Sequence, residues 1–229
     1  NSNFSSTITN FPGSLSSRQV NAQPLIVLND FVLNGTSIFN ANNQNVTIGH
    51  NFTINNNARY TPGNNTTIFN GNGGQIFANN GTINPGLYNL TITNRSNTTI
   101  TQNLVITNNL EIHENCILQD MGRTISVSGN INNSGTHVSQ STGSITLTGN
   151  ATQNIGGNGN GIFGNLNINK TGGSAVMIAN QRFEGNIRLA SNHILDIGTY
   201  KLTLSANSNI YDALTGTGIN FNNTKMIRT

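Results

Sequence analysis

The segment LVITNNLEIHENCILQDMGRTISV, residues 104–127, decides the fold of this chain. It holds four short apolar triplets, at 104–106, 110–112, 117–119 and 125–127, and in each triplet one residue separates two that are expected to face inward. Alternation over so few residues predicts β-strands of about three residues. Asn and Gly recur between the triplets, and both tolerate the left-handed backbone angles that sharp corners need. The segment therefore predicts short strands joined by tight corners.

The same pattern recurs along the chain. Residues 100–112 align with 177–189 at an offset of 77, and residues 46–57 resemble 104–115, which lie 58 residues further on. Three short strands with their corners would make a coil of about 20 residues, so these offsets are close to three and four coils. We therefore expect 46–57, 104–115 and 181–192 to lie on one face of a stack of coils.

Strands this short favour a parallel β-solenoid over an antiparallel sandwich, whose strands commonly have about 5–6 residues. The predicted fold class is all-β, a right-handed β-helix in which corner asparagines can form amide ladders along the stack. Residues 1–40 are predicted to form an N-terminal cap or the first coils, with the apolar run LIVL at 25–28 as a first strand or a cap. Residues 41–229 are predicted to form the solenoid repeats, which we expect to continue beyond residue 229.

The alternation also predicts which side chains fill the interior. Thr91, Thr146 and Thr203 each stand between two apolar residues and are predicted to point outward. The predicted inward ladders include Leu90, Ile92, Leu110, Ile112, Ile145, Leu147, Leu166, Ile168, Leu202 and Leu204.

Charge is scarce, and this bounds the possible partners. Only 7% of the 229 residues are charged, against about 25% in an average globular domain, and the net charge is +3. The basic residues are scattered without interleaved aromatics, so nucleic acid is not an expected partner. No apolar run reaches the about 18 residues that a membrane span needs. The single cysteine, Cys116, excludes an intrachain disulfide, and its apolar neighbours predict a buried side chain.

The acidic residues do not form a catalytic motif. Hydrolysis of a glycosidic bond needs two carboxyl groups about 5–9.5 Å apart, and no two acids stand with a basic residue in a compact motif. Glu111 alternates with apolar neighbours and is expected in solvent. Asp120 and Asp196 each precede an apolar residue and a glycine, a pattern typical of a corner aspartate that bonds its own backbone. The acids considered are Asp30, Glu111, Glu114, Asp120, Glu184, Asp196 and Asp212.

Metal and cofactor sites are not expected either. His50, His113, His137 and His193 share no ligand spacing, and each is predicted at the surface or at a corner. Oxygen-rich corners could ligate calcium, but acids are few and the acidic nonapeptide of calcium-binding solenoids is missing. The sequence therefore predicts no catalytic, no cofactor-binding and no metal-binding residues, and no cofactor.

Three motifs carry a resemblance to a known family. They are Q-x-I-G-G at 153–157, F-x-N-L-x-I-N at 163–169 and the glycine- and leucine-patterned stretch at 185–204. In this phrasing the chain resembles the Asn/Thr-rich repeats of large surface proteins from Bacteroidota. The resemblance implies a secreted protein at the cell surface, of the kind exported by the type IX secretion system, and some such proteins are adhesins used in gliding or attachment.

Three functions remain open. The first is a structural or adhesive segment, a rigid stalk or display surface whose partners would be surface polysaccharide or other adhesin and secretion components. The second is a carbohydrate-binding or carbohydrate-active β-helix, which needs an aromatic-lined groove. The third is an ice-binding array of outward threonine pairs, which the intervening coils do not continue. The aromatics that look inward or isolated are Phe39, Tyr60, Phe69, Phe77, Tyr88 and Tyr200.

Overall fold

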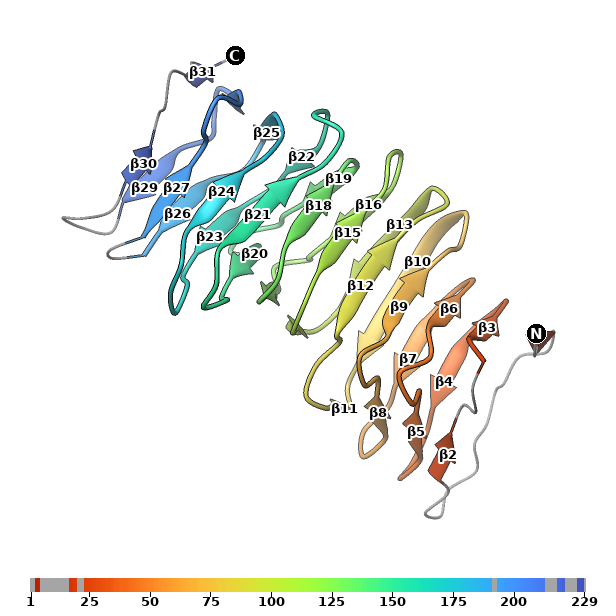
Figure 1. The fold of residues 1–229 in the computed structure, drawn as a ribbon. Helices are drawn as coiled ribbons and strands as arrows, with labels where there is room; N and C mark the ends of the chain where they lie inside the picture. Colours follow the sequence, from red (N-terminus) through yellow and green to blue (C-terminus); the bar gives the residue numbers. More distant parts are fainter. Residues whose placement is uncertain are drawn as a thin grey trace.

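The chain folds as a parallel β-solenoid (Figure 1). The computed structural model describes residues 23–190 and 193–212, together with the strand segments Asn3–Phe4, Ser17–Gln19, Gly218–Asn220 and Met226–Arg228. These described parts contain short strands and turns without a helix, and neighbouring strands pair in parallel. The predicted fold class is confirmed.

Each coil visits three faces in turn. Sheet A comprises β1 (Asn3–Phe4), β3 (Leu25–Val27), β6 (Val46–Ile48), β9 (Thr66–Phe69), β12 (Asn89–Ile92), β15 (Leu110–Ile112), β18 (Ile131–Asn133), β21 (Gln153–Gly156), β24 (Ala175–Met177), β27 (Ile194–Asp196) and β30 (Gly218–Asn220). Sheet B comprises β4 (Phe31–Leu33), β7 (Phe52–Ile54), β10 (Gly73–Asn79), β13 (Ser96–Ile100), β16 (Ile117–Gln119), β19 (Thr136–Val138), β22 (Ile162–Phe163), β25 (Gln181–Phe183), β28 (Leu202–Leu204) and β31 (Met226–Arg228).

The third face is divided between two sheets. Sheet C comprises β2 (Ser17–Gln19), β5 (Ile38–Asn40), β8 (Arg59–Thr61) and β11 (Thr82–Ile83). Sheet D comprises β14 (Leu104–Ile106), β17 (Thr124–Val127), β20 (Ser144–Leu147), β23 (Leu166–Ile168), β26 (Ile187–Leu189) and β29 (Ile210–Asp212). Among the described residues, sheets C and D do not pair with each other. An isolated parallel bridge between Leu87 and Ile106 extends sheet D by one coil toward the N-terminus.

The interior is a continuous apolar column. All ten residues predicted to face inward are buried, with exposed fractions of 0 or 1%. Aromatic rings add stacks along the same column, since Phe52 lies 4.9 Å from Phe31 and 5.2 Å from Phe77 between ring centroids. Each coil alone would leave its apolar face in water, so stacking the coils is what buries it.

The three threonines predicted to point outward do so, but Thr146 is less exposed than Thr91 and Thr203. Thr91 and Thr203 are half-buried between fully buried neighbours, as outward residues of a strand are. Thr146 also lies on the outer side of its sheet, but only 8% of it is exposed. Its hydroxyl is covered by Ser144 and Asn167, which approach it to hydrogen-bonding distance.

In β16 the predicted inward phase is wrong. Leu118 is buried, whereas Ile117 and Gln119 are half-buried on the outer side. The inward positions before and after Leu118 belong to Cys116 and Asp120, both buried. Two adjacent apolar residues do not reveal which of them faces inward, and a buried aspartate hides the alternation from a reading based on hydrophobicity.

The expectation that three similar segments share one face is also wrong. Segment 46–57 joins sheets A and B, 104–115 joins sheets D and A, and 181–192, whose last two residues lie outside the described residues, joins sheets B and D. Each coil contains three strands. From β6 to β14 the chain advances eight strands, or two and two thirds coils, and from β14 to β25 it advances eleven strands, or three and two thirds coils, so each segment begins on a different face. Any two short strands joined by a corner need the same local pattern of residues, whichever two faces they belong to. Sequence similarity between such segments therefore does not show that they lie on the same face.

Corner asparagines connect successive coils. The side-chain oxygen of Asn109 accepts a hydrogen bond from the backbone N–H of Asn130, and that of Asn130 accepts one from Asn154, both at 2.8 Å. A direct bond between amides also occurs, from Asn108 to Asn89 at 2.9 Å. The ladders therefore run largely from side chain to backbone. They satisfy N–H groups at corners, where the chain leaves its strands.

Candidate functional site

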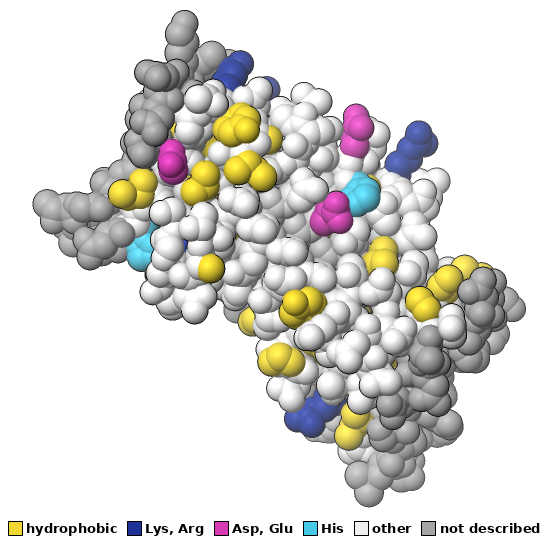
Figure 2. Space-filling view, in the orientation of Figure 1, with side chains coloured by type: hydrophobic (Ala, Val, Ile, Leu, Met, Phe, Trp, Pro, Cys, Tyr) yellow, Lys and Arg dark blue, Asp and Glu magenta, His cyan; other side chains and the backbone are white. Residues whose placement is uncertain are grey.

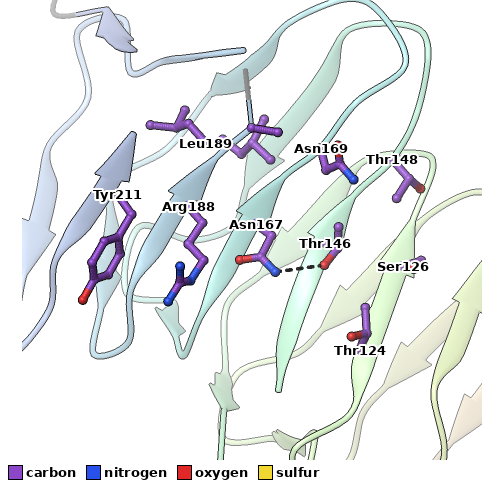
Figure 3. Close-up of a pocket in the computed structure, with 11 residues that line it drawn as sticks. Thr124, Ser126, Thr146, Thr148, Asn167, Asn169, Arg188, Leu189 and Tyr211 are labelled. Atoms are coloured by element: carbon purple, nitrogen blue, oxygen red, sulfur yellow. Dashed lines mark hydrogen bonds between the residues drawn. The ribbon is translucent and has the colours of Figure 1, made fainter. Parts of the chain in front are cut away.

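A groove with mixed polar and apolar lining lies on the outer face of sheet D. It crosses strands β17, β20, β23, β26 and β29 and has a volume of about 710 Å³. Its lining combines hydroxyl and amide side chains with one guanidinium and one phenol ring (Figure 3). The lining residues are Thr124, Ser126, Thr146, Thr148, Asn167, Ile168, Asn169, Arg188, Leu189, Ala190 and Tyr211.

The parallel register builds the central row of this groove. Ser126 pairs with Thr146, Thr146 with Asn167, Asn167 with Arg188, and Arg188 with Tyr211. Ser126, Thr146, Asn167 and Arg188 each stand between two buried apolar residues, and Tyr211 continues the row as the register partner of Arg188, so all five project to the same side. Adjacent strands are about 4.8 Å apart, so the row presents one side chain per coil along the solenoid axis.

Hydrogen bonds orient the amide in the middle of the row. Asn167 donates from Nδ2 to Ser144 Oγ at 2.9 Å and to Thr146 Oγ1 at 3.4 Å. These bonds turn the amide nitrogen toward β20 and the amide oxygen toward Arg188 (Figure 3). The middle of the groove is therefore held in one arrangement.

Arg188 and Tyr211 form the charged end of the groove. The Arg188 guanidinium carbon lies 4.5 Å from the centroid of the Tyr211 ring, a cation–π contact. Both side chains are exposed, Tyr211 by 44%. Arg188 is the charged side chain among the residues that line the groove, and no lining residue carries a carboxylate. The groove lining therefore presents one positive charge and no negative charge.

The buried pair Asp120 and His137 was not predicted. His137 Nε2 lies 3.2 Å from Asp120 Oδ2, and both side chains are completely buried. The other oxygen, Oδ1, accepts the backbone N–H groups of Gly122 and Gln140, each at 3.0 Å. Burial by itself raises the pKa of Asp120, but the hydrogen bonds from His137, Ser139, Gln140 and Gly122 outweigh it and hold that pKa below its ordinary value. The expectation that His137 sits at the surface or a corner is wrong.

The self-bonding of the two corner aspartates is confirmed. Asp196 Oδ1 accepts the N–H of Gly198 at 2.9 Å, just as Asp120 accepts that of Gly122. Asp196 is half-buried, so the two corners differ in how deeply the carboxylate lies. A solvent-borne substrate cannot reach Asp120, which makes its role structural.

Lys170 is a second buried charge. Its Nζ donates to the carbonyls of Gly149 (3.1 Å) and Ala151 (2.9 Å) and to Gln153 Oε1 (2.6 Å). Burial lowers its pKa. Three acceptors around one ammonium tie a corner of one coil to the next, so this lysine also belongs to the scaffold.

A small surface hollow brings two acids together. It has a volume of about 280 Å³ and is lined in part by Glu111, His113 and Glu114. His113 Nε2 lies 3.3 Å from Glu111 Oε1, and both side chains are exposed by more than 40%. An exposed pair of this kind contributes little to stability. The groove lining contains no carboxylate, and the two carboxylates of the hollow come from exposed side chains of β15 and the corner that follows it.

The remaining candidate residues are scattered over the molecule. Asp30 contacts His50 at 2.6 Å, Glu184 contacts Arg182 at 3.2 Å, and both acids are partly exposed. His193 is half-buried and lies 2.6 Å from the Lys170 carbonyl. The side chain of Asp212 lies outside the described residues. Cys116 is a buried free thiol, as predicted, and its burial raises its pKa.

Two residues of the groove, Arg188 and Tyr211, were not among the predicted site residues. The predictions on Phe39, Tyr60, Phe69 and Phe77 are confirmed, since all four are buried, but Tyr211 was overlooked. Arg188 was counted only as one of ten scattered basic residues. A usable signal existed in the middle residues of the sheet D strands, which are polar between apolar neighbours over four successive coils: Ser126, Thr146, Asn167 and Arg188.

The fold and the groove define a class of protein: a parallel β-solenoid with few charged side chains on the face that Figure 2 shows and with a groove on the outer face of sheet D. No family is shown beyond this class, since no family model, no curated protein and no solved structure matches the chain. Within the described ranges, no three His, Cys, Asp or Glu residues gather as metal ligands. Those ranges also contain no helix able to cross a membrane.

Proposed function

We propose that this chain is a structural and adhesive segment of a secreted cell-surface protein, a rigid stalk or display surface for attachment or gliding. The observation that carries the proposal is the continuous stacking of coils through sheets A and B, with a buried apolar column inside and corner hydrogen bonds between coils. Such a rod extends with the number of coils and presents the same faces along its length. The resemblance to Bacteroidota surface repeats supports the location, and export by the type IX system is part of the proposal.

Surface labelling of intact cells tests this role. Antibodies raised against residues 1–229 are expected to label unbroken cells of the source organism, while an antibody against a cytoplasmic protein labels them only after lysis. Removal of the signal by brief external protease treatment would agree with exposure. Labelling that appears only in lysed cells would contradict the proposal.

We further propose that the segment does not catalyse a reaction. The groove lining holds no carboxylate, and the buried Asp120 is already occupied by His137 and two backbone N–H groups. Incubation with a panel of neutral and acidic polysaccharides is therefore expected to release no reducing ends. Cleavage by the wild-type chain that disappears in the Glu111→Gln or Glu114→Gln variant would overturn this and place an active site in the small hollow.

Carbohydrate binding is a second candidate function, and the sheet D groove is the observation that favours it. Hydroxyl and amide groups that both donate and accept hydrogen bonds suit the hydroxyls of a sugar, and the groove is open to solvent along several coils. An adhesive rod that binds glycan through one face would combine both candidates.

A further inference from the structure

Arg188 differs from the nearest arginine in its ion pairing. Arg182, on the preceding strand β25, has its Nη2 3.2 Å from Glu184 Oε1. Arg188 forms no ion pair within the parts of the chain that the structure describes. Its charge faces a groove without carboxylates, so an anionic ligand would meet a guanidinium that has no competing acid in the groove lining.

The guanidinium is also held in place. Contact with the Tyr211 ring at 4.5 Å restricts the long arginine side chain, and Asn167 occupies the adjoining position on the other side (Figure 3). A planar guanidinium fixed in this way offers paired N–H donors that match carboxylate and sulfate oxygens. Less rotational freedom is then lost when the anion binds.

The shape of the groove indicates a polymer. A small inorganic anion would use Arg188 alone, whereas accessible polar side chains line the groove over the three coils that precede Arg188: Asn169, Thr148 and Ser126, one from each coil. These side chains are uncharged and repeat once per coil. They add contacts only for a ligand that is long enough to cross several strands.

We propose that the sheet D groove binds a linear acidic polysaccharide along the solenoid axis, with Arg188 taking a carboxylate or sulfate group and the hydroxyl and amide row contacting neighbouring sugars. This deepens the adhesive role proposed above and rests on it, because it names the class of surface that the rod would grip. Tyr211 acts as a positioning residue for Arg188.

Calorimetric titration of the full 229-residue chain tests the site with three probes. Oligogalacturonate carries carboxylates, dextran sulfate carries sulfate esters, and dextran is neutral. We expect measurable affinity for at least one acidic probe and none for dextran, and the acidic probe that binds more tightly identifies the anionic group. Arg188→Ala is expected to weaken binding about tenfold or more, because a hydrogen-bonded charge is lost.

Matched variants separate this site from general electrostatic attraction. Arg182→Ala removes the same charge from a neighbouring strand on another face, and its affinity is expected to stay within about twofold of wild type. Arg188→Lys keeps the charge without the paired donors and is expected to fall between wild type and Arg188→Ala. Circular dichroism of each variant verifies that the exposed substitutions leave the fold intact.

Several results would overturn the proposal. Equal losses in Arg182→Ala and Arg188→Ala would mean nonspecific charge attraction, and equal binding of dextran would remove the role of the anion. Displacement of the polymer by inorganic sulfate at equal molar concentration would reduce the groove to a simple anion site. If none of the three probes binds but intact cells are still labelled, the polysaccharide site is rejected and the proposed stalk function stands. Binding without surface labelling would reject the cell-surface role alone.

Discussion

Replacing Leu110 with Asp is expected to destabilise the solenoid strongly. Leu110 is completely buried in sheet A and stacks between Leu90 and Ile131 of the coils on either side. The substitution removes a packed side chain and places a carboxylate where no cation can reach it, which together should cost at least about 4 kcal/mol. Native domains are stable by only about 5–15 kcal/mol, so the loss takes up much of the total.

Urea unfolding followed by circular dichroism measures this effect. The matched control is Val105→Asp, because Val105 is the outward residue of β14 and is 48% exposed. The same new charge should there cost no more than about 1 kcal/mol. Similar losses in the two variants would mean that position 110 does not face a dry interior, and the inward ladder would have to be redrawn.

Replacing Asp120 with Ala is expected to cost about 3–5 kcal/mol, because three hydrogen bonds to one buried carboxylate are lost together. The variant leaves His137 buried without its carboxylate and removes the acceptor of the Gly122 and Gln140 N–H groups. Asp196→Ala is the control. Asp196 makes the same self-bond to Gly198 but is only half-buried, so about 1 kcal/mol is expected. Equal losses of stability in the two variants would show that the effect comes from the bond between the aspartate and the glycine two residues later, and not from the contact between Asp120 and His137.

The pH dependence follows from the lowered pKa of Asp120. Because the folded state holds the carboxylate charged to lower pH than the unfolded state does, the stabilisation is fully present above the ordinary pKa of about 3.9. It is lost as the pH falls through the lower folded value. The stability gap between wild type and Asp120→Ala should therefore be constant at neutral pH and narrow below about pH 4. A gap that stays constant to pH 2 would contradict the assignment.

Much of the architecture was predictable because the information is local. Alternation in a triplet such as 110–112, where Glu111 separates two apolar residues, shows which side of that strand is buried, and the corner Asn and Gly residues show where the chain turns. The corner aspartates were likewise predictable, since an Asx turn involves only the two residues that follow it. Even the misplaced phase in β16 has a local cause, because Ile117 and Leu118 are both apolar.

The face to which a strand belongs, and the residues that lie beside it in the next coil, could not be predicted from local sequence. The coils vary in length: Leu90 pairs with a residue 20 positions later, and Ile131 with one 24 positions later. Small differences in corner length accumulate, so an offset of 58 or 77 residues does not give the face. His137 was misplaced for the same reason, because its partner Asp120 comes from the neighbouring coil 17 residues earlier.

By itself, the sequence determined that this chain consists of short parallel strands stacked as a solenoid, and it determined most of the apolar side chains of the interior, since both follow from alternation and corner chemistry within a few residues. The tertiary structure decided the register between coils. That register sets Ser126, Thr146, Asn167, Arg188 and Tyr211 in one row and Asp120 against His137. The physical reason is that a contact between coils depends on the summed length and bend of all the corners between its two partners, and no local pattern encodes that sum.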